Sequence, residues 1–228
     1  MPAFTKKNLY IFLSLFLVGI VIGIILRLKI IILIFTLLLV IAIILVTTLK
    51  IREKYLQPEL SDLLTKVVQK LNEHNISYWV DYGSLLGLVR DKDVINHDTD
   101  TDICIHPSNT DLEKELLKII NELGHPYYLE YRPYDIFMYR IRKELPKPLS
   151  LFINPYTDVY GIKLEDNRYT DCSGTIPVDL IGKTQKIEWK GLQVSVPEKI
   201  HETLVWRYGE NYMTPIVGKQ PITNTIQD

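Results

Sequence analysis

The first fifth of the chain is almost continuously apolar. Between residues 9 and 49 the polar positions are a few Ser and Thr residues and the two cations Arg27 and Lys29. A helix needs about 20 apolar residues to cross a hydrocarbon core of ~30 Å, and the segments 9–26 and 30–49 each come close to that length. One helix over the whole stretch would place both cations near the bilayer centre, which is costly. The pattern therefore predicts two transmembrane helices joined by a tight hairpin turn.

Two other interpretations of this stretch stay open. A cleaved signal peptide has an apolar core of about 7–15 residues and a small-residue cleavage site, but these runs are longer and no Ala-x-Ala-like site follows them. A single membrane anchor is the second alternative, because the proposed turn, Leu26–Lys29, contains no Gly, Pro or Asn.

The charges that flank the apolar stretch predict its orientation. Basic residues lie before it, at Lys6 and Lys7, and after it, at Lys50, Arg52 and Lys54. The positive-inside rule then places both outer flanks, and a soluble domain that follows two spans, on the cytoplasmic side. With a single span the domain would instead lie in the lumen of the endoplasmic reticulum or Golgi. The sequon Asn75-Ile76-Ser77 would then be a possible glycan site.

The remaining chain alternates between helical and strand patterns. An amphipathic helix is predicted to begin at Pro58, because apolar residues recur at helical spacing; they are Leu60, Leu63, Leu64, Val67, Val68 and Leu71. Residues 77–82 alternate and predict a strand, Gly83-Ser84 a turn, and Leu85–Arg90 a short helix. A polar loop over 91–99 leads to a second strand, Asp100–Ile105. The sequence Thr110-Asp111-Leu112-Glu113 is typical of a capping box for a helix that ends at Leu123, before Gly124.

Short strand-like runs dominate the second half. They cover 127–131, 136–141, 151–154 and 157–164, and a hairpin over 186–196 turns at Lys190-Gly191. A last helix is expected from Pro197 to about Tyr208, and the residues after Pro215 lack periodicity. The order predicts an α+β fold with a mixed sheet and flanking helices. The expected organisation is a membrane anchor over 1–54, a catalytic domain over 55–215 and a tail over 216–228.

Composition excludes several classes of protein. The 228-residue chain has a formal net charge of −1, but residues 1–49 contain four basic residues and no acidic one, so the soluble part is acidic. An acidic domain without a Lys/Arg stripe argues against a nucleic-acid partner. Two cysteines, Cys104 and Cys172, are too few for a disulfide-dense scaffold or a Cys-based zinc cluster. A hydrophobic content of 47% excludes intrinsic disorder.

Two motifs in the first part of the domain indicate chemistry. At Gly83-Ser84 a strand passes into a helix, and such a turn can bind phosphate oxygens through backbone N–H groups and the Ser hydroxyl. Asp100-x-Asp102 places two carboxylates on one face of a strand, where Mg²⁺ or Mn²⁺ would relieve their repulsion and bind phosphate. Taken alone, each motif more often has no role in binding. The first is then a common turn, and the second is a solvated acidic face of a strand. Their succession is what favours a phosphate-transfer site.

A wider set of residues resembles a known family. Two strings carry the resemblance: Asp81-Tyr82-Gly83-Ser84-Leu85-Leu86-Gly87-x-x-Arg90 with Asp98-x-Asp100-x-Asp102, and the distant Trp189-Lys190-Gly191-Leu192-Gln193-Val194-Ser195-Val196-Pro197 with Tyr208-Gly209-Glu210-Asn211-Tyr212-Met213-Thr214-Pro215. Together they look like the LicD/fukutin family of phosphotransferases, within the nucleotidyltransferase superfamily of the DNA polymerase β type. The resemblance covers about Tyr78 to Pro215 and implies a nucleotidyltransferase-like sheet.

The resemblance implies an activity and a set of residues. Members of the family transfer a phosphorylated alcohol, such as phosphocholine or a pentitol or glycerol phosphate, from a CDP-activated donor to a glycan hydroxyl. Carried onto this chain, Asp100 and Asp102 are the ligands of Mg²⁺ or Mn²⁺. A third carboxylate is expected on a later strand, and Asp158 is preferred over Asp179 because it lies in a strand-like run with apolar neighbours. Gly83 and Ser84 would bind the donor's phosphate.

The remaining open points concern Arg90 and the second motif. The guanidinium of Arg90 either binds phosphate through its fork of donors or closes a helix at the surface. The family usually has Pro-Trp before the first acid and another acid after it, whereas here those places hold Asn96-His97 and Thr99. These departures keep two alternatives open. One is nucleotidyl transfer to a protein or small-molecule hydroxyl, and the other is a non-catalytic scaffold.

Overall fold

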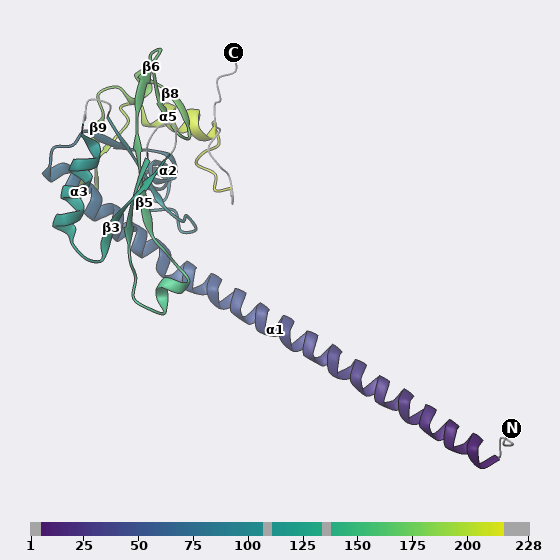
Figure 1. Ribbon diagram of the computed structural model, residues 1–228. Helices are drawn as coiled ribbons and strands as arrows, with labels where there is room; N and C mark the ends of the chain where they lie inside the picture. Colours follow the sequence, from purple (N-terminus) through teal and green to yellow (C-terminus); the bar gives the residue numbers. More distant parts are fainter. Residues whose placement is uncertain (1–5, 107–110, 134–137, 217–228) are drawn as a thin grey trace. The chain divides into compact units, whose positions relative to one another are not determined.

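The computed structural model describes residues 6–106, 111–133 and 138–216. The chain divides into two compact units, Met1–Lys50 and Ile51–Asp228. The second unit holds a five-stranded sheet, two smaller sheets and their helices (Figure 1). The predicted α+β class with a mixed sheet is therefore confirmed.

The N-terminal stretch differs from the predicted hairpin. Helix α1 runs from Lys6 to Glu73 and passes through residues 26–29 without a break (Figure 1). Leu, Arg and Lys are good helix formers, and no Gly, Pro or Asn interrupts them, so the local sequence continues the helix. The predicted two spans, and the cytoplasmic orientation that depended on them, are thus not supported. By length and composition α1 is apolar enough to cross a membrane, with a mean hydropathy of 3.5 in its most apolar window.

The C-terminal part of α1 belongs to the domain core. The predicted amphipathic face is confirmed, because Leu60, Leu64 and Leu71 are fully buried, as are the other three residues of that face. Pro58 does not begin this helix but lies inside α1. A proline inside a helix removes one backbone hydrogen bond, which here does not stop the helix.

The central sheet has the spatial order β1-β2-β5-β4-β3. Its strands are β1 (Tyr78–Val80), β2 (Thr101–Ile105), β5 (Tyr156–Gly161), β4 (Met138–Lys143) and β3 (Tyr127–Arg132). Strands β2 and β5 are parallel, and the other neighbouring pairs are antiparallel. Two strands far apart in sequence therefore run side by side in the same direction at the middle of the sheet.

Alternation along the strands separates two faces of the sheet. On one face, Ile103, Ile141 and Val159 join the large core formed with α1 and with α3 (Leu112–Leu123). On the other face, Cys104 and Tyr160 pack in a smaller apolar cluster with residues of β7 (Arg168–Asp171) and β8 (Gly174–Pro177). The second face lies outside the large core, and polar residues of the strands can bind a ligand there.

The other predicted elements are mostly present, with shifted bounds. The remaining helices are α2 (Tyr82–Arg90), α4 (Val178–Ile181) and α5 (Ile200–Tyr208), and the remaining strands are β6 (Lys163–Glu165), β9 (Gln185–Trp189) and β10 (Leu192–Val196). The predicted hairpin is confirmed, and Lys190 and Gly191 both have positive φ, at 49° and 77°. Helix α3 ends before Gly124 as expected, whereas Thr110 of the predicted capping box lies outside the described residues.

The strand predictions were least accurate between residues 149 and 177. The run 151–154 is not a strand: Leu151 ends the 3₁₀ helix η1 (Leu149–Leu151), and residues 152–154 lie in neither a helix nor a strand. The run 157–164 covers β5 except for its first residue, and also the beginning of β6, whereas β7, β8 and α4 were not predicted. Residues 136 and 137 of another predicted strand, and the tail after Ile216, lie outside the described residues.

The packing of Gly87 gives a test of this fold. A Cβ at Gly87 would lie 2.6 Å from the carbonyl oxygen of Asp93 and 3.1 Å from the nitrogen of Ile95. We expect Gly87→Ala to lower the free energy of unfolding by roughly 1–3 kcal/mol, because rigid backbone must move. Thermal unfolding of the full-length protein in detergent measures this. Gly23→Ala is the control, since nothing lies within 4 Å of its added Cβ; equal effects of the two substitutions would contradict the packing.

Candidate active site

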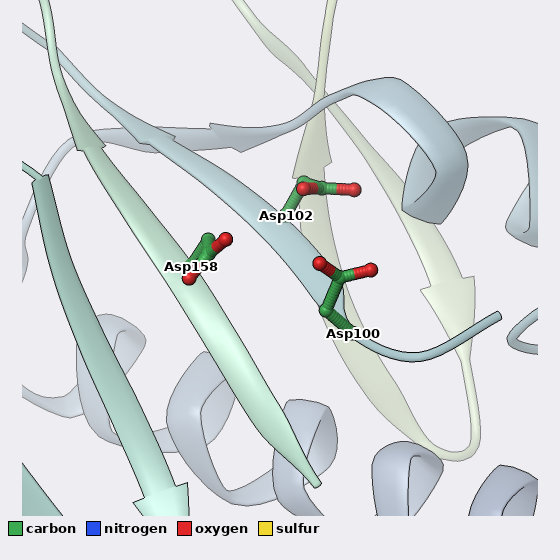
Figure 2. A group of neighbouring side chains, drawn as sticks. All are labelled: Asp100, Asp102 and Asp158. Carbon is green, nitrogen blue, oxygen red and sulfur yellow. The ribbon is translucent and has the colours of Figure 1, made fainter. Parts of the chain in front are cut away.

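Three carboxylates meet on the second face of the central sheet. Asp100 comes directly before β2, Asp102 lies within β2, and Asp158 is the register partner of Asp102 on β5. One oxygen from each carboxylate lies within 4.8 Å of the others. Figure 2 shows the three side chains on the same side of the two neighbouring strands. The predicted grouping of Asp100, Asp102 and Asp158 is thus present in the structure.

The rival third carboxylate is not part of this group. Asp179 lies on α4, where its Oδ2 is 3.1 Å from the Nζ of Lys199 and its side chain is 63% exposed. An exposed ion pair of this kind contributes little. Among the described residues, Asp158 is therefore the carboxylate that completes the group.

Burial and neighbouring acids raise the pKa values of Asp100 and Asp102. Burial, followed by the charges of Asp98 and Asp158, raises the pKa of Asp100 to about 6. Burial and the neighbouring acids raise the pKa of Asp102 well above its usual range. Both shifts have the same cause, since a desolvated carboxylate beside like charges is unfavourable in its ionised form. A divalent cation that prefers oxygen ligands, such as Mg²⁺ or Mn²⁺, fits this donor set and would remove the repulsion.

Arg140 is a site residue that the sequence reasoning missed. Its Nε donates to Asp158 Oδ1 at 2.6 Å and its Nη2 to Asp158 Oδ2 at 3.0 Å. The guanidinium also lies over the ring of Tyr156, with its carbon 3.8 Å from the centroid. This paired contact orients Asp158 and offsets part of its charge. The local pattern of β4 contains no signal for it, because the pattern does not tell which strand lies beside β4.

The Gly83-Ser84 motif lies beside the carboxylates, in the first turn of α2. Both residues are inside the helix, which Asp81 caps, rather than in a turn before it as predicted. The hydroxyl of Ser84 accepts the backbone N–H of Asp102 at 2.7 Å. A Cβ at Gly83 would lie 2.6 Å from Asp98 Oδ2 and 3.7 Å from Asp102 Oδ2. A side chain at this position would therefore displace the carboxylate of Asp98, which lies against the helix backbone.

Asp98 contributes a fourth acidic group to the same region. Its Oδ1 accepts the backbone N–H of Thr99 at 3.1 Å, while its Oδ2 faces Gly83. Burial raises the pKa of Asp98. Asp98 thus caps its own loop and adds negative charge beside the group of three.

A cleft of about 770 Å³ opens over this region. Its walls come from α2, from the loop before β2, from the turn between β7 and β8, and from the chain around the end of α5; among the residues that line it are Gly83, Asp100, Asp102, Ser173, Tyr208 and Tyr212. A volume of this order is typical of small-molecule sites. The carboxylates and the first turn of α2 therefore face a space that can hold a ligand.

Arg90 also lines the cleft, but its guanidinium already has a partner. The Nε and Nη2 atoms each donate to the neighbouring Asp91 carboxylate, both at 2.8 Å. The arrangement matches the interpretation of Arg90 as a residue that closes a helix, although it stands at the cleft wall. Phosphate binding by Arg90 stays a prediction.

The sequence of this domain matches a known protein family. Residues 75–199 match the family described as LicD/FKTN/FKRP, nucleotidyltransferase domain. No curated protein matches the chain in sequence. The solved structures that are similar to it include two of ANT(2″)-Ia. One is the crystal structure of ANT(2″)-Ia in complex with adenylyl-2″-tobramycin, with 18% identity and a TM-score of 0.42 over 65% of this chain and 73% of that one. The other is the solution structure of antibiotic-resistance factor ANT(2″)-Ia, with 17% identity and a TM-score of 0.43 over 67% and 71%.

The raised pKa values predict a pH-dependent affinity for metal. A proton on Asp100 competes with the cation, and its pKa of about 6 places this competition between about pH 5 and pH 7. We expect the affinity of the full-length protein for Mn²⁺ to rise roughly tenfold or more as pH rises from 5 to 7.5, measured by titration calorimetry in detergent. Asp179→Asn should leave the profile unchanged. A flat profile in the unmodified protein would contradict the assignment.

Proposed function

This chain belongs to the LicD/fukutin family, and from that premise we propose that it is a metal-dependent phosphotransferase. In the proposed reaction it moves a phospho-alcohol, phosphocholine or a pentitol or glycerol phosphate, from a CDP-activated donor to a glycan hydroxyl. The observation that supports the proposal best is the group formed by Asp100, Asp102 and Asp158 beside Ser84. The family match alone supports the broader statement that the domain is of the nucleotidyltransferase type.

The proposed roles follow from the contacts of each residue. Asp100, Asp102 and Asp158 would hold Mg²⁺ or Mn²⁺, which when bound neutralises charge on the phosphoryl oxygens. Gly83 has no side chain between the first turn of α2 and the acidic group, and the N–H groups at the start of a helix favour anions such as phosphate. Arg140 holds both oxygens of Asp158 in place. This contact favours Asp158 as a metal ligand rather than as the group that accepts the proton of the acceptor hydroxyl.

The bonds of the proposed step can be stated. The acceptor hydroxyl oxygen forms a bond with the phosphorus next to the alcohol, and the bond from that phosphorus to the oxygen bridging it to CMP breaks. CMP leaves with the electron pair, and the hydroxyl proton passes to solvent or to a carboxylate of the site. Because little covalent chemistry falls to the protein, positioning and charge neutralisation supply most of the rate.

Nucleotidyl transfer is the alternative that the family description favours. The same carboxylate geometry would serve it, but the nucleotide itself would be attached to the acceptor hydroxyl. The mass of the product distinguishes the two reactions. A non-catalytic scaffold would give neither product.

A transfer assay tests the proposal. The full-length protein is incubated with Mn²⁺, a mixture of glycan acceptors, and CDP-choline, CDP-ribitol or CDP-glycerol, and products are identified by mass spectrometry. We expect release of CMP and an acceptor heavier by the phospho-alcohol. Asp100→Asn should lower the rate by at least about 100-fold with an unchanged fold, because it removes a ligand that neutralises transition-state charge. Asp179→Asn is the matched control, and full activity in Asp100→Asn would end this mechanism.

We further propose that α1 anchors the domain to a membrane. The apolar side chains of residues 13–49 are largely exposed, with Leu33 and Phe35 each at 68%. An exposed apolar surface of this extent is rare in a soluble monomer. Asn75, exposed after the end of α1, would report the side of the membrane, since its sequon is modified only in the lumen.

Extraction from membranes tests the anchor. We expect the full-length protein to stay in the membrane pellet after alkaline carbonate, because the helix inserts into hydrocarbon. Replacing Leu37, Leu38 and Leu39 together by Lys should release it, since each charge costs about 3 kcal/mol at a helix centre. Release of the unmodified protein by carbonate would refute the anchor.

A further inference from the structure

A buried ion pair lies directly behind the first turn of α2. Arg207 on α5 donates from Nε to Asp81 Oδ1 at 3.2 Å and from Nη2 to Asp81 Oδ2 at 2.8 Å. The Arg207 side chain is 4% exposed and that of Asp81 is fully buried. Asp81 also accepts the indole N–H of Trp79 at 3.1 Å and the backbone N–H of Tyr82 at 2.7 Å. Both oxygens of this carboxylate are therefore engaged from several directions.

Tyr82 connects this pair to a second part of the fold. The guanidinium carbon of Arg207 lies 4.0 Å from the centre of the Tyr82 ring. The Tyr82 hydroxyl lies 2.8 and 2.9 Å from the two oxygens of Asp171, to which it donates. Tyr82 has a φ of 49°, in the left-handed region that is unfavourable for a bulky residue. Such a conformation persists only when its surroundings hold it, and here the contacts with Arg207 and Asp171 do so.

Asp171 extends the connection to the turn between β7 and β8, which also lines the cleft. Its Oδ1 accepts the backbone N–H of Ser173 at 2.7 Å and that of Gly174 at 3.0 Å. Ser173 lines the cleft, as does Gly83. The buried network thus joins α5, the first turn of α2 and the turn between β7 and β8.

The network also reaches the carboxylate group through Ser84. The Ser84 hydroxyl accepts the backbone N–H of Asp102 at 2.7 Å, so the position of the first turn of α2 is coupled to β2. Arg207 itself is not among the described residues that line the cleft. Buried ion pairs are often no more stabilising than apolar packing of similar volume, so stability alone does not account for a charge at this place.

We infer that Arg207 is a positioning residue, which acts through Asp81 and Tyr82 to hold the first turn of α2, with Gly83 and Ser84, against β2, where the phosphate of a nucleotide donor binds. The nature of the ligand rests on the proposed function. The positioning itself rests on the contacts and is tested without the ligand as well as with it.

Two variants and one matched control test the inference in the full-length protein. Tyr82→Phe removes the hydroxyl that binds Asp171, and Arg207→Lys keeps the charge but loses the paired contact with Asp81. The control is Tyr169→Phe, since Tyr169 is also a buried tyrosine whose hydroxyl has a partner, His106. Tyr82 lines the cleft and Tyr169 does not, so hydrogen exchange without ligand is the measurement that separates positioning from direct contact. The measurements are unfolding temperature, Mn²⁺ affinity, CDP affinity with Mn²⁺ present, and amide hydrogen exchange in peptides covering residues 83–88 and 100–105.

The expected results separate positioning from stability. In both variants CDP affinity should fall about five- to tenfold, which corresponds to roughly 1 kcal/mol, while Mn²⁺ affinity should change less than about twofold. Exchange should become faster in residues 83–88 and at the Asp102 amide, because the Ser84 contact loosens. Tyr169→Phe should lower the unfolding temperature similarly but leave CDP affinity and exchange in these two segments unchanged.

Opposite results would overturn the inference. It fails if Tyr82→Phe keeps wild-type exchange at the Asp102 amide, or if Tyr169→Phe loses as much CDP affinity as Tyr82→Phe. If Arg207→Lys does not fold, Tyr82→Phe alone decides. If the unmodified protein binds neither CDP nor Mn²⁺, the proposed function fails, while the exchange comparison still decides whether the network positions α2.

Discussion

Repulsion between carboxylates on adjacent strands is the constraint around which this domain is arranged. Asp102 and Asp158 are register partners on β2 and β5, so the backbone pairing itself places them side by side. The surroundings supply partial compensation: Arg140 binds both oxygens of Asp158, and the Tyr160 hydroxyl donates to Asp102 Oδ1 at 3.3 Å. The raised pKa values of Asp100 and Asp102 show that this compensation is incomplete, and a cation would complete it.

One face of the central sheet contributes to the stability of the domain, and the other face carries the carboxylates of the candidate site. One face is covered by α1 and α3 and contributes fully buried residues such as Ile103 and Val159. The acids occupy the alternate positions of the same strands, so a shift of one residue in register would bury them in that core. The large core therefore fixes the register, and the register fixes where the carboxylates point. Stability of the apolar face is in this way a precondition of the site.

The sequence predicted those parts of the site that depend on local geometry. Asp100-x-Asp102 shares a face because alternation is a property of any strand, and Gly83-Ser84 lies beside it because a short helix follows β1 directly. Asp158 required the resemblance to a family, because the pairing of β2 with β5 joins segments more than fifty residues apart. Arg140, Asp171 and Arg207 have no local signal, since each acts through a tertiary contact. The predicted hairpin in α1 was wrong although the local sequence did contain a signal, and that signal was for helix. It was argued from the cost of cations in a bilayer, whereas the local residues all favour helix.

The residues that depart from the family pattern lie outside the group formed by Asp100, Asp102 and Asp158. Asn96, His97 and Thr99 are exposed residues of the loop before β2, and none contributes an oxygen to the group of three. His97 and Thr99 instead line the cleft. A change at these positions alters what a ligand meets at the rim while the backbone of β2 keeps Asp100 and Asp102 in place. The altered motif thus bears on which ligand enters the cleft, and it leaves intact the arrangement that would hold a metal ion.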